Sequence, residues 1–265
     1  MKVIVSFLIF FLFKSPVGVP GKIPVKGIIG EVIVISYLVG NGIAWMSGAY
    51  PKDFPVIDYS PENSQAVADY RNLLEENPDD PEVLLELGMI YADHNRLDDA
   101  EKSLEKATEK APGNQRARAY LASVRTKIAG ASWDFTFGLY ELSKLKSAIE
   151  ELNTAQEKAP DDALVRVVHA STLASVGPRT ASFDKIKEDE SWWKSGGENR
   201  PAEMAPFFNL SFANYYAKKA EDANDEANNA ANKKIATDYL DAIPMEKLPY
   251  TFAPTYKKIR NTLEK

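Results

Sequence analysis

Cysteine is absent from the 265-residue chain, and histidine occurs only at His94 and His169. The first absence excludes disulfide bonds, thiolate catalysis and metal sites with cysteine ligands. An HExxH motif, a glycine-rich phosphate loop and a nucleophile elbow are also missing. Because no pattern typical of catalysis is left, the sequence predicts a protein that is not an enzyme and needs neither cofactor nor metal.

A basic stripe of the kind that binds nucleic acid is missing as well. The chain has a formal net charge of −6. Residues 1–51 contain four lysines and one glutamate, a net charge of +3, so the rest of the chain carries −9. An apolar, mildly basic head therefore precedes an acidic body. This balance argues against nucleic acid as a partner, because phosphate backbones are bound by basic surfaces.

Two apolar runs occupy the head, and we assign residues 1–50 as an apolar signal or membrane-anchor region. Val3–Phe13 is unbroken by any charge. As a helix it covers about 16 Å, roughly half of a hydrocarbon core, which is typical of a signal-peptide core. Ile28–Tyr50 is long enough to cross the core as a helix. We therefore expect residues 28–50 to anchor the protein in a membrane.

The charges that flank the second run predict its orientation. Lys22 and Lys26 precede it, whereas Asp53 and Asp58 follow it. Because positive charge is retained on the cytoplasmic side, the body is expected on the extracytoplasmic (periplasmic) side.

Two other interpretations of the head stay open. In the first, a short signal peptide precedes an apolar segment that docks inside a protein complex. In the second, the head is prepilin-like, with processing after Lys26-Gly27 and Glu31 as a buried acid.

The most regular part of the body runs from Pro81 to Asn114. Two predicted helices each present one apolar face, formed by Leu84, Leu87 and Tyr91 in the first and by Ala100, Leu104 and Ala107 in the second. Gly88 and Ala100 are small and are expected to face each other, and Pro112 ends the second helix. Such a pair cannot bury its apolar face alone, so neighbouring pairs must stack on it.

This spacing resembles the helix–turn–helix pattern of the tetratricopeptide repeat (TPR), and the chain as a whole is similar to a bacterial membrane-anchored TPR protein. The resemblance implies an all-α fold, a right-handed helical solenoid preceded by the N-terminal apolar membrane segment. Along the chain it assigns a linker at 51–60, TPR-like repeats over 61–195 (half repeat 61–80, repeat 81–114, interrupted repeat 115–162, divergent repeat 163–195), a loop at 196–206, and divergent C-terminal helices with a cap at 207–265.

The half repeat is expected to begin with Ser60 as N-cap and Pro61 at the first helical position. Ala66, Tyr70 and Leu73 reproduce the spacing of a second helix and are its expected anchors.

In this family partners usually lie in the groove formed by first helices. The positions that the resemblance assigns to the groove are Glu82, Leu85, Met89 and Asp93, then Arg116, Ala119, Ser123 and Lys127, then Leu164, Val167 and Ser171. A groove that is apolar in part and basic at Arg116 and Lys127 suits an extended peptide or an amphipathic helix, and would orient an acidic or C-terminal segment. Alternatively, the chain's own C-terminal helices cover Leu85 and Met89.

An aromatic insertion interrupts the second repeat at Trp133, Phe135, Phe137 and Tyr140. These residue types are enriched in interface hot spots, so Trp133 and Phe135 are candidate partner contacts. As an alternative, the aromatic side chains pack the insertion against its own repeat. The pair Trp192-Trp193 is more typical of a loop anchor than of a ligand site.

Together these features predict a scaffold or adaptor that is tethered to a membrane and binds a partner protein, as part of a membrane or extracytoplasmic complex. The alternative is an integral accessory subunit whose apolar head packs permanently among the helices of a larger membrane assembly.

Overall fold

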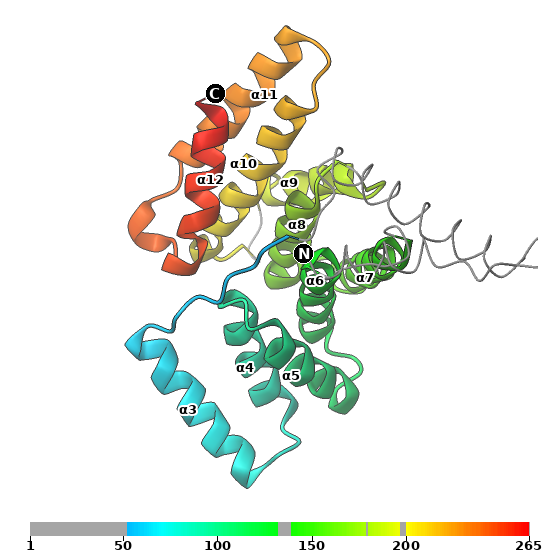
Figure 1. Ribbon diagram of the computed structural model, residues 1–265, viewed down its shortest axis with the longest axis vertical. Helices are drawn as coiled ribbons and strands as arrows, with labels where there is room; N and C mark the ends of the chain where they lie inside the picture. The colour runs from blue at the N-terminus through cyan, green and yellow to red at the C-terminus, as the bar shows by residue number, and fades with distance from the viewer. Residues whose placement is uncertain (1–51, 132–138, 179, 197–199, 265) are drawn as a thin grey trace, which may run out of the picture. The chain divides into compact units, whose positions relative to one another are not determined.

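The computed structural model describes residues 52–131, 139–178, 180–196 and 200–264, and these residues form helices without any strand (Figure 1). Two compact units divide the chain, one of residues 1–52 and 132–142 and one of residues 53–131 and 143–265. The repeat helices and the C-terminal helices belong to the second unit. The predicted membrane segment and the candidate contacts Trp133 and Phe135 lie outside the described residues. Within those residues, no helix combines the length and the hydropathy that a membrane span requires.

The helices follow one another with short connections. Their bounds are α3 (Pro61–Glu76), α4 (Pro81–Asp93), α5 (Leu97–Lys110), α6 (Gln115–Ala131), α7 (Leu139–Lys158), α8 (Ala163–Val176), α9 (Ile186–Lys194), α10 (Ala205–Glu221), α11 (Glu226–Asp241) and α12 (Ala253–Leu263). Short 3₁₀ turns precede α9, α10 and α12, and another lies at Met245–Lys247. The all-α prediction is confirmed for the described residues.

Helix α3 begins as its sequence predicts. Ser60 is the N-cap, and its hydroxyl accepts a hydrogen bond of 3.2 Å from Asn63 N. Its anchors agree with the prediction only in part, since Tyr70 packs against the core as expected but Leu73 does not. Val67 is buried and Leu74 packs beside it, whereas the Leu73 side chain is 48% exposed. The prediction assigned Leu73 to the buried face of α3, and this was wrong. Helix α3 packs chiefly on α4, so only a narrow apolar stripe along it is buried.

The pair of α4 and α5 forms the best-defined repeat. Asp80 caps α4 through its carboxylate, which accepts hydrogen bonds from Glu82 N and Val83 N. A Cβ atom added to Gly88 would lie 2.6 Å from Leu104 Cγ, so only glycine permits this approach of the two helices. The expected contact between Gly88 and Ala100 is therefore corrected: the residue that meets Gly88 is Leu104.

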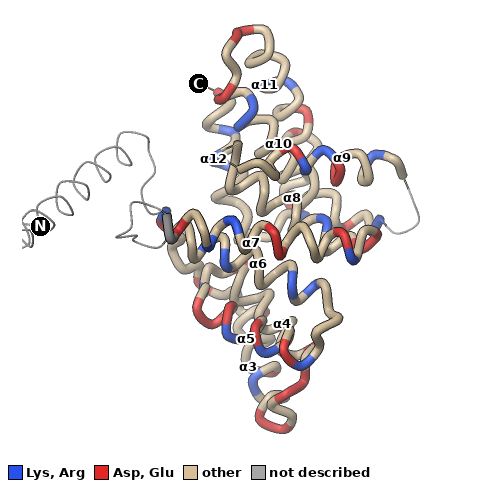
Figure 2. Tube along the Cα trace, turned by 90° about the vertical axis from the view of Figure 1, so that its right-hand side faces the viewer, with Lys and Arg blue, Asp and Glu red and all other residues tan. Residues whose placement is uncertain are grey.

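Successive first helices pack on one another, in the order α4, α6, α8 and α10. Each of α4, α8 and α10 also packs against the helix that follows it, and α5 packs against α6. Helix α12 rests on both α10 and α11. The helix-pair pattern therefore continues through the C-terminal helices. Acidic and basic residues are interspersed along the tube in Figure 2, so the part of the chain that is coloured there shows no single basic stripe.

Aromatic side chains hold the C-terminal helices on the repeats. Trp193 stacks on Phe208, with 4.4 Å between ring centroids, and Trp192 Nε1 donates a hydrogen bond of 3.3 Å to Asp161. Phe208 and Phe212 are fully buried in the core that α8 and α10 share. Both tryptophans therefore anchor the end of α9, as expected of a loop anchor.

An extended segment, residues 53–60 (the strap), joins the first repeat to the C-terminal part. Ile57 N donates a hydrogen bond of 3.0 Å to His94 O. The Tyr250 hydroxyl accepts a hydrogen bond of 2.7 Å from Ser60 N and lies 2.8 Å from His94 Nε2. Because Ser60 and Tyr250 are 190 positions apart, most of the predicted linker is bound to the body rather than loose.

Candidate protein-binding face

The predicted groove positions divide by burial. Leu85, Ala119 and Val167 have exposed fractions of 3%, 0% and 6%, so their side chains belong to the core and offer a partner almost no surface. Met89 and Asp93 are half-buried, as are Ser123, Leu164 and Ser171. Glu82 and Arg116 are exposed. The fifth residue of each of α4, α6 and α8 is therefore buried. The surface available to a partner is formed by the positions before and after it along each helix.

The two cations of the predicted groove both have partners within the body. The Arg116 guanidinium forms an ion pair of 2.7 Å with Asp162, the N-cap of α8. The Lys127 ammonium donates hydrogen bonds of 3.2 Å to Ala92 O and to the side chain of Asn95. Both cations therefore tie neighbouring repeats together, and the charge of Arg116, whose side chain is 54% exposed, is offset in part by Asp162.

A row of polar groups beside the predicted positions has no such partners. We define the α4 face as Tyr70 on α3, Glu86, Met89 and Asp93 on α4, and Tyr120 on α6. Neither carboxylate and neither tyrosine hydroxyl of this face has a hydrogen-bond or ion-pair partner among the described residues. None of these polar atoms is among the fully buried atoms without a partner, so water reaches them and a ligand could take its place.

Burial and mutual repulsion shift the ionisation of these groups. Burial raises the pKa of Asp93 to about 6, and the neighbouring Lys127 ammonium opposes that shift. Burial raises the pKa of Tyr120 well above its ordinary value, and the charges of Asp93 and Glu86 raise it further. Burial also raises the pKa of Tyr70, again with a contribution from Glu86. The α4 face is therefore a region of negative potential at neutral pH.

Both histidines are buried in satisfied networks. His169 Nδ1 lies 2.5 Å from Asp189 Oδ2, and His169 Nε2 lies 3.0 Å from Asn153 Oδ1. The other Asp189 oxygen accepts a hydrogen bond of 2.9 Å from Arg166. Asp189 has no exposed side-chain surface, so no substrate reaches it. In the described residues no group of three histidine, aspartate or glutamate side chains is placed to hold a metal ion.

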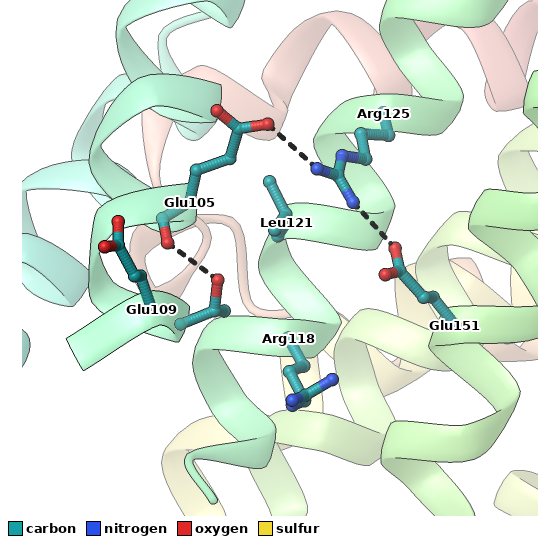
Figure 3. Close-up of a pocket in the computed structure, with 7 residues that line it drawn as sticks. Glu105, Glu109, Arg118, Leu121, Arg125 and Glu151 are labelled. Carbon is teal, nitrogen blue, oxygen red and sulfur yellow. Dashed lines mark hydrogen bonds and ion pairs between the residues drawn. The ribbon is translucent and has the colours of Figure 1, made fainter. Parts of the chain in front are cut away.

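In contrast to the α4 face, charged groups between α5, α6 and α7 are paired with one another. They lie around a hollow of about 320 Å³ (Figure 3). Arg125 on α6 lies between carboxylates of both neighbouring helices. It pairs with Glu105 at 2.9 Å, Glu151 at 2.9 Å and Glu101 at 3.3 Å. Each nitrogen of the guanidinium thus has an acceptor. We name this region the Arg125 side.

The sequence prediction missed Tyr70, Glu86 and Tyr120 as binding groups. It followed one row of first-helix positions, and Tyr120 stands directly after the predicted Ala119. A signal was nonetheless present, because Glu86 and Asp93 are seven residues apart and lie on one face of α4. The sequence does not show that these groups have no partner in the part of the chain that the structure describes.

Taken together, the stacked helix pairs define the class of the fold as a helical-repeat protein. Residues 62–124 match the family model described as tetratricopeptide repeat, which supports the repeat assignment over this part of the chain. Repeats of this kind typically serve as interaction modules without catalytic activity. A search of curated proteins found no match to the chain.

Proposed function

We propose that this protein is a non-enzymatic scaffold that binds a partner protein through the α4 face. The observation that carries the proposal is that the polar groups of this face have no partner among the described residues, whereas the buried carboxylates Asp189 and Glu190 are both paired. Met89 adds half-buried apolar surface at its centre. Methionine adapts to varied partner shapes, which suits a surface for protein recognition.

The membrane tether is a second element of the proposal. It rests on the sequence alone, namely on the length of the apolar run at residues 28–50 and on the lysines before it and acids after it. In this proposal the repeats lie on the extracytoplasmic side and hold a partner close to the membrane. A permanent accessory subunit is the alternative, and the stoichiometry of co-purification separates the two.

The test is affinity purification of the full-length protein after detergent extraction of membranes, followed by mass spectrometry. We expect the protein in the carbonate-resistant membrane fraction, together with a partner that high salt removes. Substitution Met89→Arg should abolish partner retention, because it places a long cation in the centre of the α4 face. The matched control is Met245→Arg, since Met245 is 45% exposed, stands on the 3₁₀ turn Met245–Lys247 and is not one of the residues of the α4 face.

Three results would contradict parts of the proposal. Retention of the partner by the Met89→Arg variant would rule out the α4 face. Full-length protein in the soluble fraction would rule out the tether. A partner that stays at fixed stoichiometry through high-salt washing would favour the accessory subunit. Circular dichroism melting of both variants shows whether any loss of binding reflects unfolding.

A further inference from the structure

The two carboxylates of the α4 face are spaced along one side of a helix. Glu86 and Asp93 are two turns apart, a rise of about 10 Å at 1.5 Å per residue. Glu86 is exposed and Asp93 is half-buried. The helices that carry Tyr70 and Tyr120, α3 and α6, both pack on α4, and the charge of Glu86 contributes to the raised pKa of each tyrosine. The face therefore offers two separate anionic points, with a tyrosine on each of two neighbouring helices.

The cation next to Asp93, Lys127, already has hydrogen-bond partners within the body. Lys127 is the cation whose charge acts on Asp93, but its ammonium donates to Ala92 O and to Asn95. Burial lowers the pKa of Lys127, so its environment also disfavours the charged form. Lys127 therefore offsets the charge of Asp93 only in part, and Glu86 has no ion-pair partner among the described residues.

We propose that the α4 face recognises a basic segment of the partner, with one lysine or arginine at Glu86 and a second cationic side chain at Asp93. This inference rests on the proposed function and names the chemistry of the partner. It reverses the expectation of an acidic or C-terminal ligand, because that expectation depended on Arg116 and Lys127, which are both engaged.

Three features of the face match such a segment. Ion pairs with a partly buried carboxylate are stronger than pairs in open water, because the local dielectric is lower. Tyrosine rings attract a cation that lies over them, because the ring face carries partial negative charge. The half-buried side chain of Met89 provides apolar surface for the methylene stem of a lysine or arginine.

The spacing of the carboxylates also restricts the conformation of the segment. In a polyproline-II segment, residues three apart lie on one side at about 9 Å, which is close to the separation of Glu86 and Asp93 along α4. A segment with basic residues at positions i and i+3 therefore reaches both carboxylates at once. This geometry agrees with the extended mode of peptide recognition.

The probes for the test are two fluorescein-labelled peptides of about ten residues in a proline, alanine and serine background. One carries two lysines three positions apart, and the other carries glutamates at the same positions. Fluorescence anisotropy with the full-length protein in detergent should show binding of the lysine peptide at least about tenfold tighter than binding of the glutamate peptide, a difference of about 1.4 kcal/mol. Equal affinity for the two peptides, or binding of neither, would overturn the inference.

The variant that tests the site is Asp93→Asn, which keeps the shape of the side chain and removes its charge. We expect it to weaken binding of the lysine peptide about tenfold. Lowering the pH from about 7.5 to about 5 should weaken binding to the wild type to a similar extent, because Asp93 becomes protonated around pH 6, and should have less effect on the variant. The control is Glu109→Gln on α5, an exposed acid at the Arg125 side, which should bind like the wild type.

The outcomes separate this inference from the function it rests on. If Met89→Arg releases the cellular partner but Asp93→Asn retains it, the α4 face binds a partner and the basic segment is wrong. If both variants retain the partner, both proposals fail. An equal loss of peptide binding in Asp93→Asn and Glu109→Gln would indicate nonspecific attraction to an acidic body and would also overturn the inference.

Discussion

The Arg125 side and the α4 face lie on neighbouring helices of one repeat array, but they differ in whether their charged groups have ion-pair partners. On the Arg125 side one guanidinium reaches three carboxylates from two helices, all within 3.3 Å. On the α4 face two carboxylates and two tyrosine hydroxyls have no partner among the described residues. Paired charge joins repeats to one another. Unpaired charge stabilises nothing within the body and is free to act on a ligand.

This difference distinguishes a structural site from a binding site without reference to a ligand. A half-buried carboxylate without a partner is costly, because partial desolvation disfavours its charged form. A protein that keeps such a group gives up stability at that position, which is characteristic of functional sites. The comparison therefore predicts opposite signs for substitutions in the two kinds of region.

The largest effect is expected where paired charge is most deeply buried. Asp189 has no exposed side-chain surface and pairs with both Arg166 and His169. Substitution Asp189→Ala removes the acceptor that these two buried side chains share and should destabilise the protein by about 3–5 kcal/mol. Urea unfolding of the wild type and the variant measures the change. A loss below about 1 kcal/mol would show that this network is not a stabilising element of the repeats.

A substitution at the α4 face should have the opposite sign. The folded-state pKa of Asp93 is raised to about 6 by burial, above the ordinary value for an aspartate. The folded state therefore binds protons more tightly than the unfolded state between about pH 4 and pH 6, and the free energy of unfolding falls as the pH rises through that window. Asp93→Asn removes this penalty, so it should stabilise the protein by about 1–3 kcal/mol at pH 8 and by almost nothing at pH 4.

Urea titrations at pH 4 and pH 8 test this prediction, with Glu109→Gln as the control, because Glu109 is exposed and should change little at either pH. A destabilised Asp93→Asn variant at pH 8 would mean that Asp93 is a structural group. Greater stability together with lost peptide binding is the combination that identifies a functional carboxylate.

The sequence was sufficient for the framework of the repeats but not for the open face. Leu84, Tyr91 and Leu104 are buried as their spacing predicts, because a 3.6-residue period depends only on local geometry. The phase of α3 was wrong at Leu73, since that helix packs chiefly on one neighbour and its pattern is weakly constrained. Partners distant in sequence were not predictable at all. Arg116 pairs with Asp162, which is 46 positions away in the sequence, and no local sequence pattern predicts such a pair.

The candidate site depended on the same long-range information. Leu85 and Ala119 have groove positions by spacing, but they are buried, and the burial of such positions depends on how neighbouring repeats pack. The open groups stand on the adjacent row, at Glu86 and Tyr120. A row of positions can be read from the repeat, whereas the presence or absence of a partner for each group requires the packed structure.

The smallest effect is expected on the Arg125 side. Substitution Arg125→Gln removes three ion pairs, but the side chains involved are between 32% and 52% exposed, so solvent screens each pair. Such pairs contribute about 0.2–1 kcal/mol each, and we expect a total loss of about 1 kcal/mol in low salt. The difference from the wild type should shrink in 1 M salt, where the Debye length is about 3 Å. Binding of the lysine peptide should not change, because Arg125 pairs with carboxylates of α5 and α7 and not with those of the α4 face. If Arg125→Gln weakened binding as strongly as Asp93→Asn does, the distinction between paired and unpaired charge would not separate structural from binding surfaces in this protein.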